Sequence, residues 1–455
     1  MTTTKQPLTA HDDYRIVLYY LYTEIRDAEK HVQFQTALCD RLDLTGRIRV
    51  ATEGINGVLS GRIGQLQEYE TTFVRELQTT NPSLRANDLD LKYCYLRNDL
   101  TVEEQLFPNL IVKITKTVIG LVDTPSSSSS SKNRRQKSTK HKRNRFVQVN
   151  DDDNNIDNNN HDNELSDTAF VRRVYERTMK DLALDKNDDV PSTHDEKESM
   201  RVPHLNPDDW DRRVETITRQ PEHSVVFLDC RNMYESNVGH FRSPHAQTIL
   251  TNTRKFSELP QVLVEQSDAL AQSTHIFAYC TGGVRCERAT VFLKGLLRQK
   301  YPHQALPEIY QLRGGIQRYL EHSVSNTKTT TTQESKSKAS SSLYKGKNFV
   351  FDPRRMDPVH DASDSVVGRC LVCQQLHDDY DNGHAPVLDR AARCWNCRVL
   401  ILVCNQCRSN VSCWGDDERK REQEGTRLPR MYCGGPDQTC WHRPPVQVLT
   451  ESTSK

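Results

Sequence analysis

A glycine-rich segment at residues 279–287, which reads YCTGGVRCE, constrains the fold of this chain more than any other feature. It follows a short apolar run and precedes a stretch, 287–298, whose apolar residues recur at helical spacing. Similar apolar runs at 224–229 and 308–312 predict neighbouring strands. Strands that alternate with helices form a parallel sheet, and ligands bind beyond the carboxyl ends of its strands. We therefore expect residues 201–325 to form an α/β domain with a parallel sheet.

The same segment predicts a reactive thiol. Gly282 and Gly283 allow the backbone to curl, so that several N–H groups point inward at the start of the following helix. Such a nest of amides lowers the pKa of a cysteine at its mouth from about 8.5 towards neutrality or below. Arg285 is placed to close the loop and add a charge-assisted donor. We predict that Cys280 is a nucleophilic thiolate and that Cys280 and Arg285 are the catalytic residues. The residues expected to support the loop are Thr281, Gly282, Gly283, Val284, Cys286, Glu287, Asp229 and Arg231.

These supporting residues have different interpretations. Cys286, on the first helical turn, is either a thiol that resolves an oxidised Cys280 or a packing residue of the helix. Asp229 and Arg231 follow a predicted strand and are expected to form a structural pair beside the loop. Glu287 is expected to stabilise the helix start as a first-turn acid, with proton transfer as the alternative.

The size of the loop indicates which anion it holds. The spacing from Cys280 to Arg285 is one residue shorter than the Cys-x5-Arg loop of cysteine phosphatases. Because a shorter loop encloses less volume, it suits a single terminal sulfur better than a phosphate. The residues themselves therefore favour a persulfide on Cys280.

The N-terminal part of the chain has a different element order. Residues 14–123 read as strand, helix, strand, strand, helix, strand, which predicts a ferredoxin-like (acylphosphatase-like) α+β domain. Glu53, Asn56 and Gly57 lie at a predicted turn of this domain. Turn chemistry explains the Asn and Gly, and an RNA-facing role is the alternative interpretation.

Short segments around the glycine-rich loop resemble a rhodanese domain. They read LDCRNMYE at 228–235 and GHF at 239–241, and Gly314 and Gly315 follow the last predicted strand. The chain departs from the rhodanese pattern at Cys230, where an aliphatic residue is common. It also has polar residues after the GHF segment, where small apolar residues are usual, and this departure concerns substrate fit more than fold.

Further segments make the resemblance closer. The CTGGVRCE motif, GRIRVATEGING at 46–57, YQLRGGIQRYL at 310–320 and GKNFVFD at 346–352 are similar to the tRNA uridine hydroxylase family of rhodanese-domain proteins. The eukaryotic members of that family are of the thiosulfate sulfurtransferase/rhodanese-like domain-containing protein 2 type. The resemblance implies oxygen-dependent hydroxylation of a wobble uridine at ring carbon 5, with Cys280 as the essential cysteine. It likewise implies tRNA as the partner and molecular oxygen as a co-substrate.

Low-complexity sequence separates the predicted domains. Residues 124–200, with a basic run at Lys132–Arg145, are expected to be a disordered insert and linker. A polar helix within 166–200 is the only element expected there. The basic run is interpreted as a solvated spacer, with RNA contact or a nuclear address as alternatives. Residues 1–13 are expected to be a flexible tail and 326–342 a linker.

Composition indicates the cellular compartment. No apolar run has the length of a membrane span, and the first residues fit neither a signal peptide nor a transit peptide. We expect a cytoplasmic protein without a membrane partner. Since thiols stay reduced there, the 14 cysteines indicate catalytic or metal-binding roles rather than disulfides.

The region 343–445 is predicted to be a cysteine-rich, zinc-binding tail, followed by a short end segment at 446–455. Two Cys-x2-Cys pairs separated by 20 residues suit a tetrahedral zinc site. A third pair either joins the second one or holds a second zinc with later ligands, and the metal is expected to supply folding energy. The three pairs are Cys370 and Cys373, Cys394 and Cys397, and Cys404 and Cys407.

Two rival functions belong to other classes. A sulfurtransferase would move sulfane sulfur from a small-molecule donor, thiosulfate, through a persulfide on Cys280. A non-catalytic binding module would use the rhodanese fold as a scaffold, but a scaffold needs no cysteine in this loop.

Overall fold

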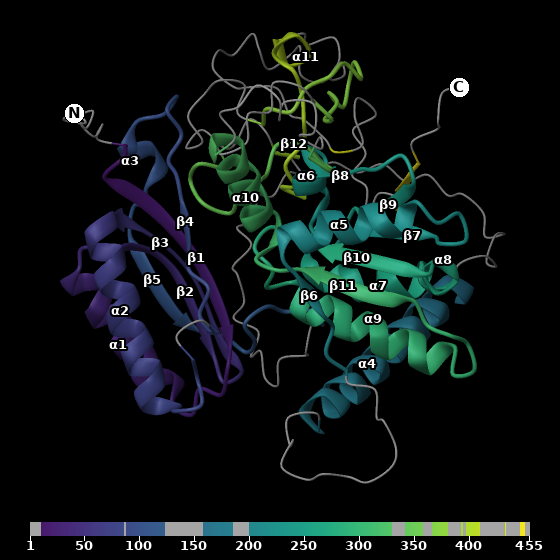
Figure 1. Cartoon of the computed structure of the whole chain (residues 1–455), viewed down its shortest axis with the longest axis horizontal. Helices are drawn as coiled ribbons and strands as arrows, with labels where there is room; N and C mark the ends of the chain where they lie inside the picture. Colours follow the sequence, from purple (N-terminus) through teal and green to yellow (C-terminus); the bar gives the residue numbers. More distant parts are fainter. Residues whose placement is uncertain are drawn as a thin grey trace, which may run out of the picture.

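Figure 1 shows the computed structural model of the chain, in which two α/β domains lie side by side. No helix among the residues that the structure describes is long and apolar enough to cross a membrane. The described residues are 11–85, 88–122, 158–184, 200–329, 342–357, 366–380, 393–394, 397–409, 433 and 446–450.

The N-terminal domain is a five-stranded sheet in the order β4-β1-β3-β2-β5, with two helices on one face (Figure 1). Its paired strands are antiparallel, except that β2 and β5 are parallel. The predicted ferredoxin-like arrangement is thus confirmed, and β5 extends it at one edge. The elements are β1 (Tyr14–Tyr22), α1 (Ala28–Arg41), β2 (Thr45–Ala51), β3 (Gly54–Arg62), α2 (Ile63–Thr80), β4 (Lys92–Cys94), α3 (Val102–Gln105) and β5 (Leu110–Ile114).

Strand β1 has two different faces. Val17, Tyr19 and Leu21 are buried in the core that α1 and α2 cover. Leu18 and Tyr20 point the other way, towards the glycines of the loop in the second domain. Side chains alternate along a strand, so this apolar and aromatic strand can serve both faces at once.

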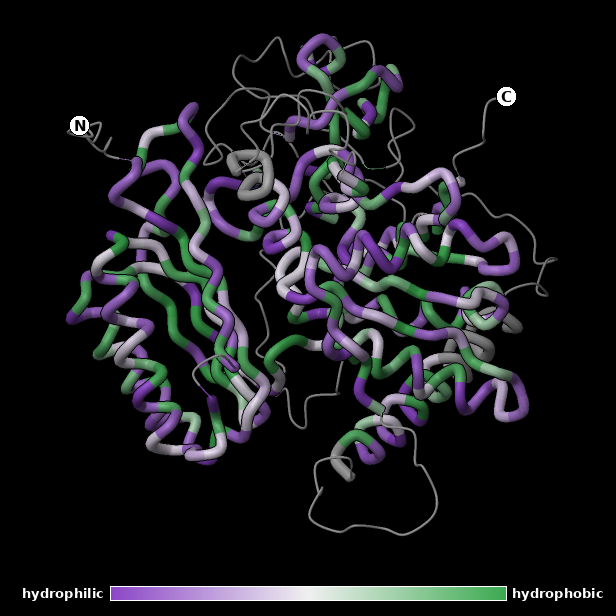
Figure 2. Tube along the Cα trace, viewed as in Figure 1, coloured by the Kyte–Doolittle hydropathy of each residue, from purple (hydrophilic) through white to green (hydrophobic). Residues whose placement is uncertain are grey.

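The second domain, called the central domain here, spans residues 200–329 and has a six-stranded sheet in the order β13-β9-β7-β10-β11-β6. Its strands are parallel, as predicted, except for the edge strand β13. Figure 2 shows hydrophobic residues along the strands of both sheets. The elements are β6 (His204–Leu205), α5 (Pro207–Thr218), β7 (Val225–Asp229), α6 (Met233–Ser236), β8 (Gly239–Phe241), β9 (Ala246–Leu250), η2 (Phe256–Glu258), α7 (Leu259–Glu265), α8 (Ser267–Gln272), β10 (His275–Tyr279), α9 (Cys286–Lys300), β11 (Glu308–Leu312) and α10 (Gly315–Thr329).

Helices cover both faces of this sheet. Helices α5 and α10 enclose an aromatic core in which Trp210 packs against Phe227 and Phe277. Helices α7, α8 and α9 cover the opposite face, where Cys280 and Cys286 are part of the core. The loop after β10 therefore lies at the carboxyl edge of a sheet that is buried on both sides.

Helix α4 (Asn158–Leu184) overlaps the polar helix expected within 166–200, but it begins earlier, inside the part of the insert that was expected to be disordered. It packs along α9, with Val171 and Val174 buried in the central core. The buried stripe is narrow and lies within a polar, charged sequence, so hydrophobic periodicity did not reveal it. The serine run and the basic run of the insert lie outside the described residues.

The C-terminal part of the chain returns to both domains. β12 (Tyr344–Gly346) pairs with β8, and β13 (Gln447–Leu449) pairs with β9. Strand β13 lies in the end segment at 446–455, for which no strand was predicted, because three residues are too few to show a period. Between these strands, the guanidinium of Arg97 donates a 2.9 Å hydrogen bond to the carbonyl of Arg354 and ties the returning segment to the N-terminal domain.

Candidate active site

The loop between β10 and α9 encloses the sulfur of Cys280. Gly283 has a φ of +99°, a conformation that glycine adopts readily, and its amide donates a 3.2 Å hydrogen bond to Cys280 Sγ. Burial opposes ionisation of this thiol. The Cys286 thiol, the Arg285 charge and the amides of both residues outweigh burial and lower the pKa of Cys280 to about 6. Cys280 is therefore mostly a thiolate at neutral pH.

Arg285 closes the loop by binding a carboxylate that sequence reasoning missed. Its two terminal nitrogens donate hydrogen bonds of 2.7 and 2.6 Å to the carboxylate of Glu235, on α6. Thr281 joins them, because its hydroxyl donates to Glu235 and accepts from Arg285. Glu235 is fully buried, and its presence raises the pKa of Arg285 despite burial. A sequence signal for Glu235 did exist. It lies three residues after Asn232, and the two residues form a capping box at the start of α6.

Asp229 and Arg231 form a second buried ion pair beside the loop. The guanidinium donates to both carboxylate oxygens, at 2.9 and 2.7 Å, and the hydroxyl of Ser236 donates to the same carboxylate. Arg231 also donates to the carbonyl of Gly239 at the start of β8. The geometry fits the structural role expected for this pair, because it fixes the end of β7 against α6 and β8.

Three thiols meet behind the loop. The Cys286 thiol interacts with the thiols of both Cys280 and Cys230, and all three residues belong to one buried cluster in the central core. Burial and the two neighbouring thiols raise the pKa of Cys286 well above its ordinary value. Cys286 is thus a packing residue of α9 and, at the same time, a direct neighbour of the Cys280 sulfur.

The N-terminal domain covers the loop from outside. A Cβ atom at Gly282 would lie 2.9 Å from Leu18, and one at Gly283 would lie 2.8 Å from the hydroxyl of Tyr20. The two glycines therefore have two effects. They allow the loop to curl, and they allow β1 to approach the loop closely. Cys280 itself has no exposed surface under this cover.

Glu287 connects the start of α9 to the N-terminal domain. Its carboxylate accepts a 3.0 Å hydrogen bond from the Tyr20 hydroxyl and lies 2.8 Å from His204 Nε2. Burial opposes ionisation, but the hydrogen bonds from His204, Tyr20 and Gln311 lower the pKa of Glu287. A carboxylate at a helix N-terminus is also favourable to the helix dipole.

The three residues for which an RNA-facing role was considered have different surroundings in the structure. Glu53 forms an ion pair with Arg288 of α9 and accepts a 2.8 Å hydrogen bond from the amide of Val118. Asn56 and Gly57 belong to β3 rather than to a turn, which corrects the expectation, because the hairpin is shorter than predicted. Of these three, only Asn56 lines the cavity beside the loop.

That cavity has a volume of about 480 Å³ and lies between the two domains. Thr281, Gly282, Val284 and Arg285 form its wall on the loop side, and Asn56 and Val58 are among those on the sheet side. Five cationic side chains line it against a single carboxylate, that of Asp352, so the cavity favours an anion. The five cationic residues are Arg47, Arg49, Lys255, Arg285 and Arg354.

Aromatic side chains complete the cavity wall. Tyr20 and Phe256 contribute from the two domains, and Phe351 is 53% exposed, which is unusual for a large apolar side chain. A larger cavity of about 890 Å³, also lined by Tyr20, contains Asp88, Asp90 and other acids among its basic residues. The smaller cavity is therefore the better anion site, and it adjoins the thiolate loop.

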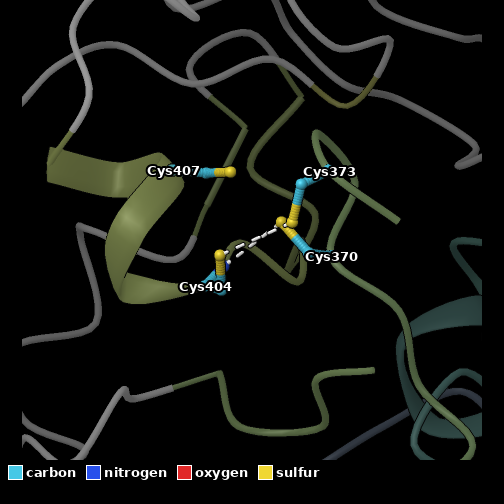
Figure 3. A group of neighbouring side chains, drawn as sticks. All are labelled: Cys370, Cys373, Cys404 and Cys407. Carbon is cyan, nitrogen blue, oxygen red and sulfur yellow. Dashed lines mark hydrogen bonds between the residues drawn. The ribbon is translucent and has the colours of Figure 1, made fainter. Parts of the chain in front are cut away.

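A group of four cysteines lies in the C-terminal region (Figure 3). The sulfur atoms of Cys370, Cys373, Cys404 and Cys407 lie within 4.8 Å of one another. The sequence left open whether Cys394 and Cys397 join the first pair or the third, and the structure brings the first and third pairs together instead. Equal Cys-x2-Cys spacings do not indicate which pairs meet in space.

The second group consists of Cys394, Cys397 and Cys433. The sulfurs of Cys397 and Cys433 lie 3.8 Å apart. The other late ligands considered from sequence, Cys413, Cys440 and His442, lie outside the described residues.

The first two cysteine pairs have the same local geometry. In one, Gln374 has a φ of +59° and its amide donates to the carbonyl of Cys370. In the other, Arg398 has a φ of +63° and its amide donates to the carbonyl of Cys394. Two thiolates projecting from such a tight turn suit tetrahedral zinc, so both groups fit the metal.

Three family models match the chain in consecutive regions. They are described as a UPF0176 acylphosphatase like domain, at residues 14–118, a rhodanese-like domain, at 214–322, and a rhodanase C-terminal region, at 345–415. A tRNA uridine(34) hydroxylase of Onion yellows phytoplasma is 25% identical over 88% of this chain and 94% of its own length. The chain contains an acylphosphatase like domain and a rhodanese-like domain, and over most of its length it is similar to the proteins named tRNA uridine(34) hydroxylase.

The chain is also similar to three other proteins. A tRNA uridine(34) hydroxylase of Streptococcus pneumoniae is 28% identical over 78% of this chain and 76% of its own length. Rhodanese-like domain-containing protein 6 of Arabidopsis thaliana is 25% identical over 89% of this chain, which spans about half, 52%, of that relative. A solved rhodanese-like domain from Anabaena is 20% identical, covers 27% of this chain and 76% of its own, and has a TM-score of 0.19.

Proposed function

We propose that this chain hydroxylates carbon 5 of the wobble uridine in tRNA, with molecular oxygen as co-substrate and Cys280 as the reactive thiolate. The observation that carries the proposal is that the thiolate loop and an anion-favouring cavity share a wall. The names of these similar proteins supply the substrate class. Cytoplasmic action follows from this substrate and from the reduced thiols that the loop requires.

The cavity has features suited to a nucleotide. Its volume of about 480 Å³ falls within the range of small-ligand sites. Tyr20 and Phe351 offer aromatic faces to a splayed base, as in other sites that bind single-stranded RNA. Arg49 is exposed at the cavity and Arg47 is half-buried there, so both can approach phosphates on either side of the base.

The catalytic roles proposed for the loop follow from its contacts. Cys280 supplies the thiolate, and Arg285 acts on it through its charge while Glu235 fixes the guanidinium in place. Thr281, Gly282 and Val284 form the surface that the substrate meets. In this proposal Leu18 and Tyr20 move aside when RNA enters, because they cover the loop in the closed structure.

Sulfur transfer is the second candidate function, and one observation favours it. The short loop and its inward Gly283 amide suit a terminal sulfur on Cys280. A sulfurtransferase would release sulfite from thiosulfate and pass the sulfane sulfur to an acceptor thiol. A purely non-catalytic module is disfavoured, because a scaffold has no use for a thiol whose pKa is lowered to about 6.

We also propose that the C-terminal region binds two structural zinc ions. Cys370, Cys373, Cys404 and Cys407 would hold one, and Cys394, Cys397 and Cys433 would hold the other with a fourth ligand. Zinc would supply folding energy to a segment with few apolar residues, and it would take no part in the chemistry at Cys280.

Nucleoside analysis tests the hydroxylation. Purified protein would be incubated with unmodified tRNA in air, and wobble nucleosides would be measured by mass spectrometry. Wild type is expected to form 5-hydroxyuridine and Cys280→Ser to form none, while Cys39→Ala, a buried thiol of the N-terminal domain, serves as the control. Equal product from wild type and Cys280→Ser would remove Cys280 from the mechanism, and sulfite release from thiosulfate without hydroxylation would favour sulfur transfer.

A further inference from the structure

We propose that Cys286 and Cys230 are redox residues of the hydroxylation: Cys286 resolves Cys280 after its oxidation, and Cys230 then takes over the disulfide. The inference rests on the proposed function and assigns the source of its reducing electrons. It gives Cys230, at which the chain departs from the usual rhodanese pattern, a chemical role.

The three sulfurs come from separate elements that the sheet brings together. Cys280 follows β10, Cys286 begins α9, and Cys230 follows β7, the neighbour of β10 in the sheet. The amide of Cys230 donates a 3.0 Å hydrogen bond to the carbonyl of Tyr279, which fixes the two strand ends side by side. The Cys286 thiol interacts with each of the other two, and the three residues pack in one buried cluster.

The arrangement differs from an ordinary buried thiol elsewhere in the chain. Cys39 is equally buried, but its neighbours in the core are aliphatic and aromatic side chains. Around Cys286, in contrast, two thiols replace apolar neighbours. Three thiols clustered in one buried core are placed for disulfide exchange, in which a sulfur attacks one end of an adjacent disulfide.

The electron balance of the reaction requires such a donor. Converting the C5–H bond of uridine to C5–OH supplies one electron pair, whereas complete reduction of dioxygen consumes two pairs. The Cys280 thiolate supplies the second pair. The O–O bond breaks, one oxygen atom is inserted at C5 and the other bonds to Cys280 Sγ, so thiolate, dioxygen and uridine give sulfenate and 5-hydroxyuridine.

Resolution then follows through the neighbouring thiols. The Cys286 thiol attacks the protonated sulfenate, a Cys280–Cys286 disulfide forms, the S–O bond breaks and the oxygen leaves as water. Cys230 attacks the Cys286 sulfur, and Cys280 leaves as a thiolate while the Cys230 proton is released. A thiol of low pKa is the better leaving group, so exchange frees Cys280 rather than Cys286.

An external reductant returns the protein to its starting state. A dithiol reductant, either a small molecule or a redox protein, reduces the Cys230–Cys286 disulfide to two thiols and is itself oxidised to a disulfide. Cys280 is already free at this stage. Its thiolate can therefore react once more before the reductant acts, and the reductant then restores the two resolving thiols.

Counting product per chain in the absence of reductant tests the proposal on the full-length protein. Reduced protein, freed of added thiols, is mixed with unmodified tRNA in air, quenched with an alkylating agent, and divided for nucleoside and peptide mass spectrometry. Wild type is expected to form roughly two 5-hydroxyuridines per chain and then stop, the first turnover leaving Cys230 and Cys286 in a disulfide and the second leaving Cys280 oxidised. Dithiothreitol is expected to restore turnover.

Two variants separate the roles. Cys286→Ser is expected to complete one turnover and to accumulate a sulfenic acid on Cys280, which dimedone captures. Cys230→Val is expected to hold the Cys280–Cys286 disulfide and to recover more slowly with dithiothreitol than wild type. Cys39→Ala is expected to match wild type in both product and recovery.

The possible failures are distinguishable. Repeated turnover without reductant and with all three thiols still alkylatable would overturn the relay while leaving the hydroxylation intact. Wild-type behaviour of Cys286→Ser, with its fold verified by circular dichroism, would do the same. Absence of 5-hydroxyuridine from wild type, with or without dithiothreitol, would instead reject the proposed function on which the relay rests.

Discussion

Glu235 accepts hydrogen bonds of 2.6 and 2.7 Å from the two terminal nitrogens of Arg285, and both side chains are buried. Removing one partner of a buried ion pair leaves the other charge uncompensated. We expect Glu235→Ala to lower the free energy of unfolding by about 3–5 kcal/mol, measured by urea denaturation. The exposed pair of Arg41 and Glu68 provides the control, since Glu68→Ala is expected to cost about 0–1 kcal/mol. Equal effects at the two sites would contradict this assignment.

The lowered pKa of Cys280 sets the pH dependence of activity. The hydroxylation rate is expected to rise as pH increases through about 6 and then to level off, because the thiolate is the reactive form. The ultraviolet absorbance of the thiolate, as wild type minus Cys280→Ser, gives the same midpoint without substrate. A midpoint near the ordinary value of 9.0 would show that the loop does not stabilise the anion.

The same ionisation affects stability. The pKa of Cys280 is lower in the folded chain than the ordinary value of 9.0 expected after unfolding. Its contribution is therefore fully present above about pH 9 and is lost as pH falls through about 6. The stability of wild type relative to Cys280→Ser, measured by urea denaturation, is expected to rise between these two values.

Arg49 provides a test of RNA binding at the cavity. It is exposed and lines the cavity, so Arg49→Ala is expected to weaken tRNA binding and to reduce the slope of log affinity against log salt by about 0.7. Arg75, exposed on α2, lies on the helix-covered side of the same domain and is the matched control. If Arg75→Ala reduced the slope equally, the cavity would not be the RNA contact.

The pairing of the cysteines gives a prediction about metal content. Cys370→Ser and Cys404→Ser are expected to lose the same one of two zinc ions, because their sulfurs belong to one group. Cys394→Ser is expected to lose the other. Plasma mass spectrometry of the purified double variants distinguishes the outcomes. A Cys370→Ser, Cys394→Ser double variant that loses only one zinc would instead support a zinc site shared by the first and second pairs.

Local sequence was sufficient to predict the thiolate loop. The groups that stabilise the Cys280 thiolate belong to Gly283, Arg285 and Cys286, which follow it closely in sequence. Their spacing along the chain therefore determines their spacing around the sulfur. The N-terminal fold was predictable for a similar reason, since its strands are long and show clear apolar periods. Both cases rest on information contained in short windows of sequence.

Contacts between distant segments were not predictable. Glu235 reaches Arg285 from 50 residues earlier, and no local pattern connects them. The burial of α4 depends on the surface that α9 presents to Val174, not on the apolar content of α4 itself. Which cysteine pairs share a zinc could not be predicted, because three pairs of identical spacing permit several combinations. Only the path of the chain selects one of them.

The alternation of side chains along β1 has a consequence for the handling of oxygen. One strand both completes the core of its own domain and seals the sulfur of the other, so the thiolate cannot be uncovered by a single side-chain rotation. Leu18 and Tyr20 would have to move together, and an RNA that enters the proposed site would have to move both. The protein would then be protected from idle oxidation between encounters, and its reactivity would depend on the arrival of the molecule it modifies.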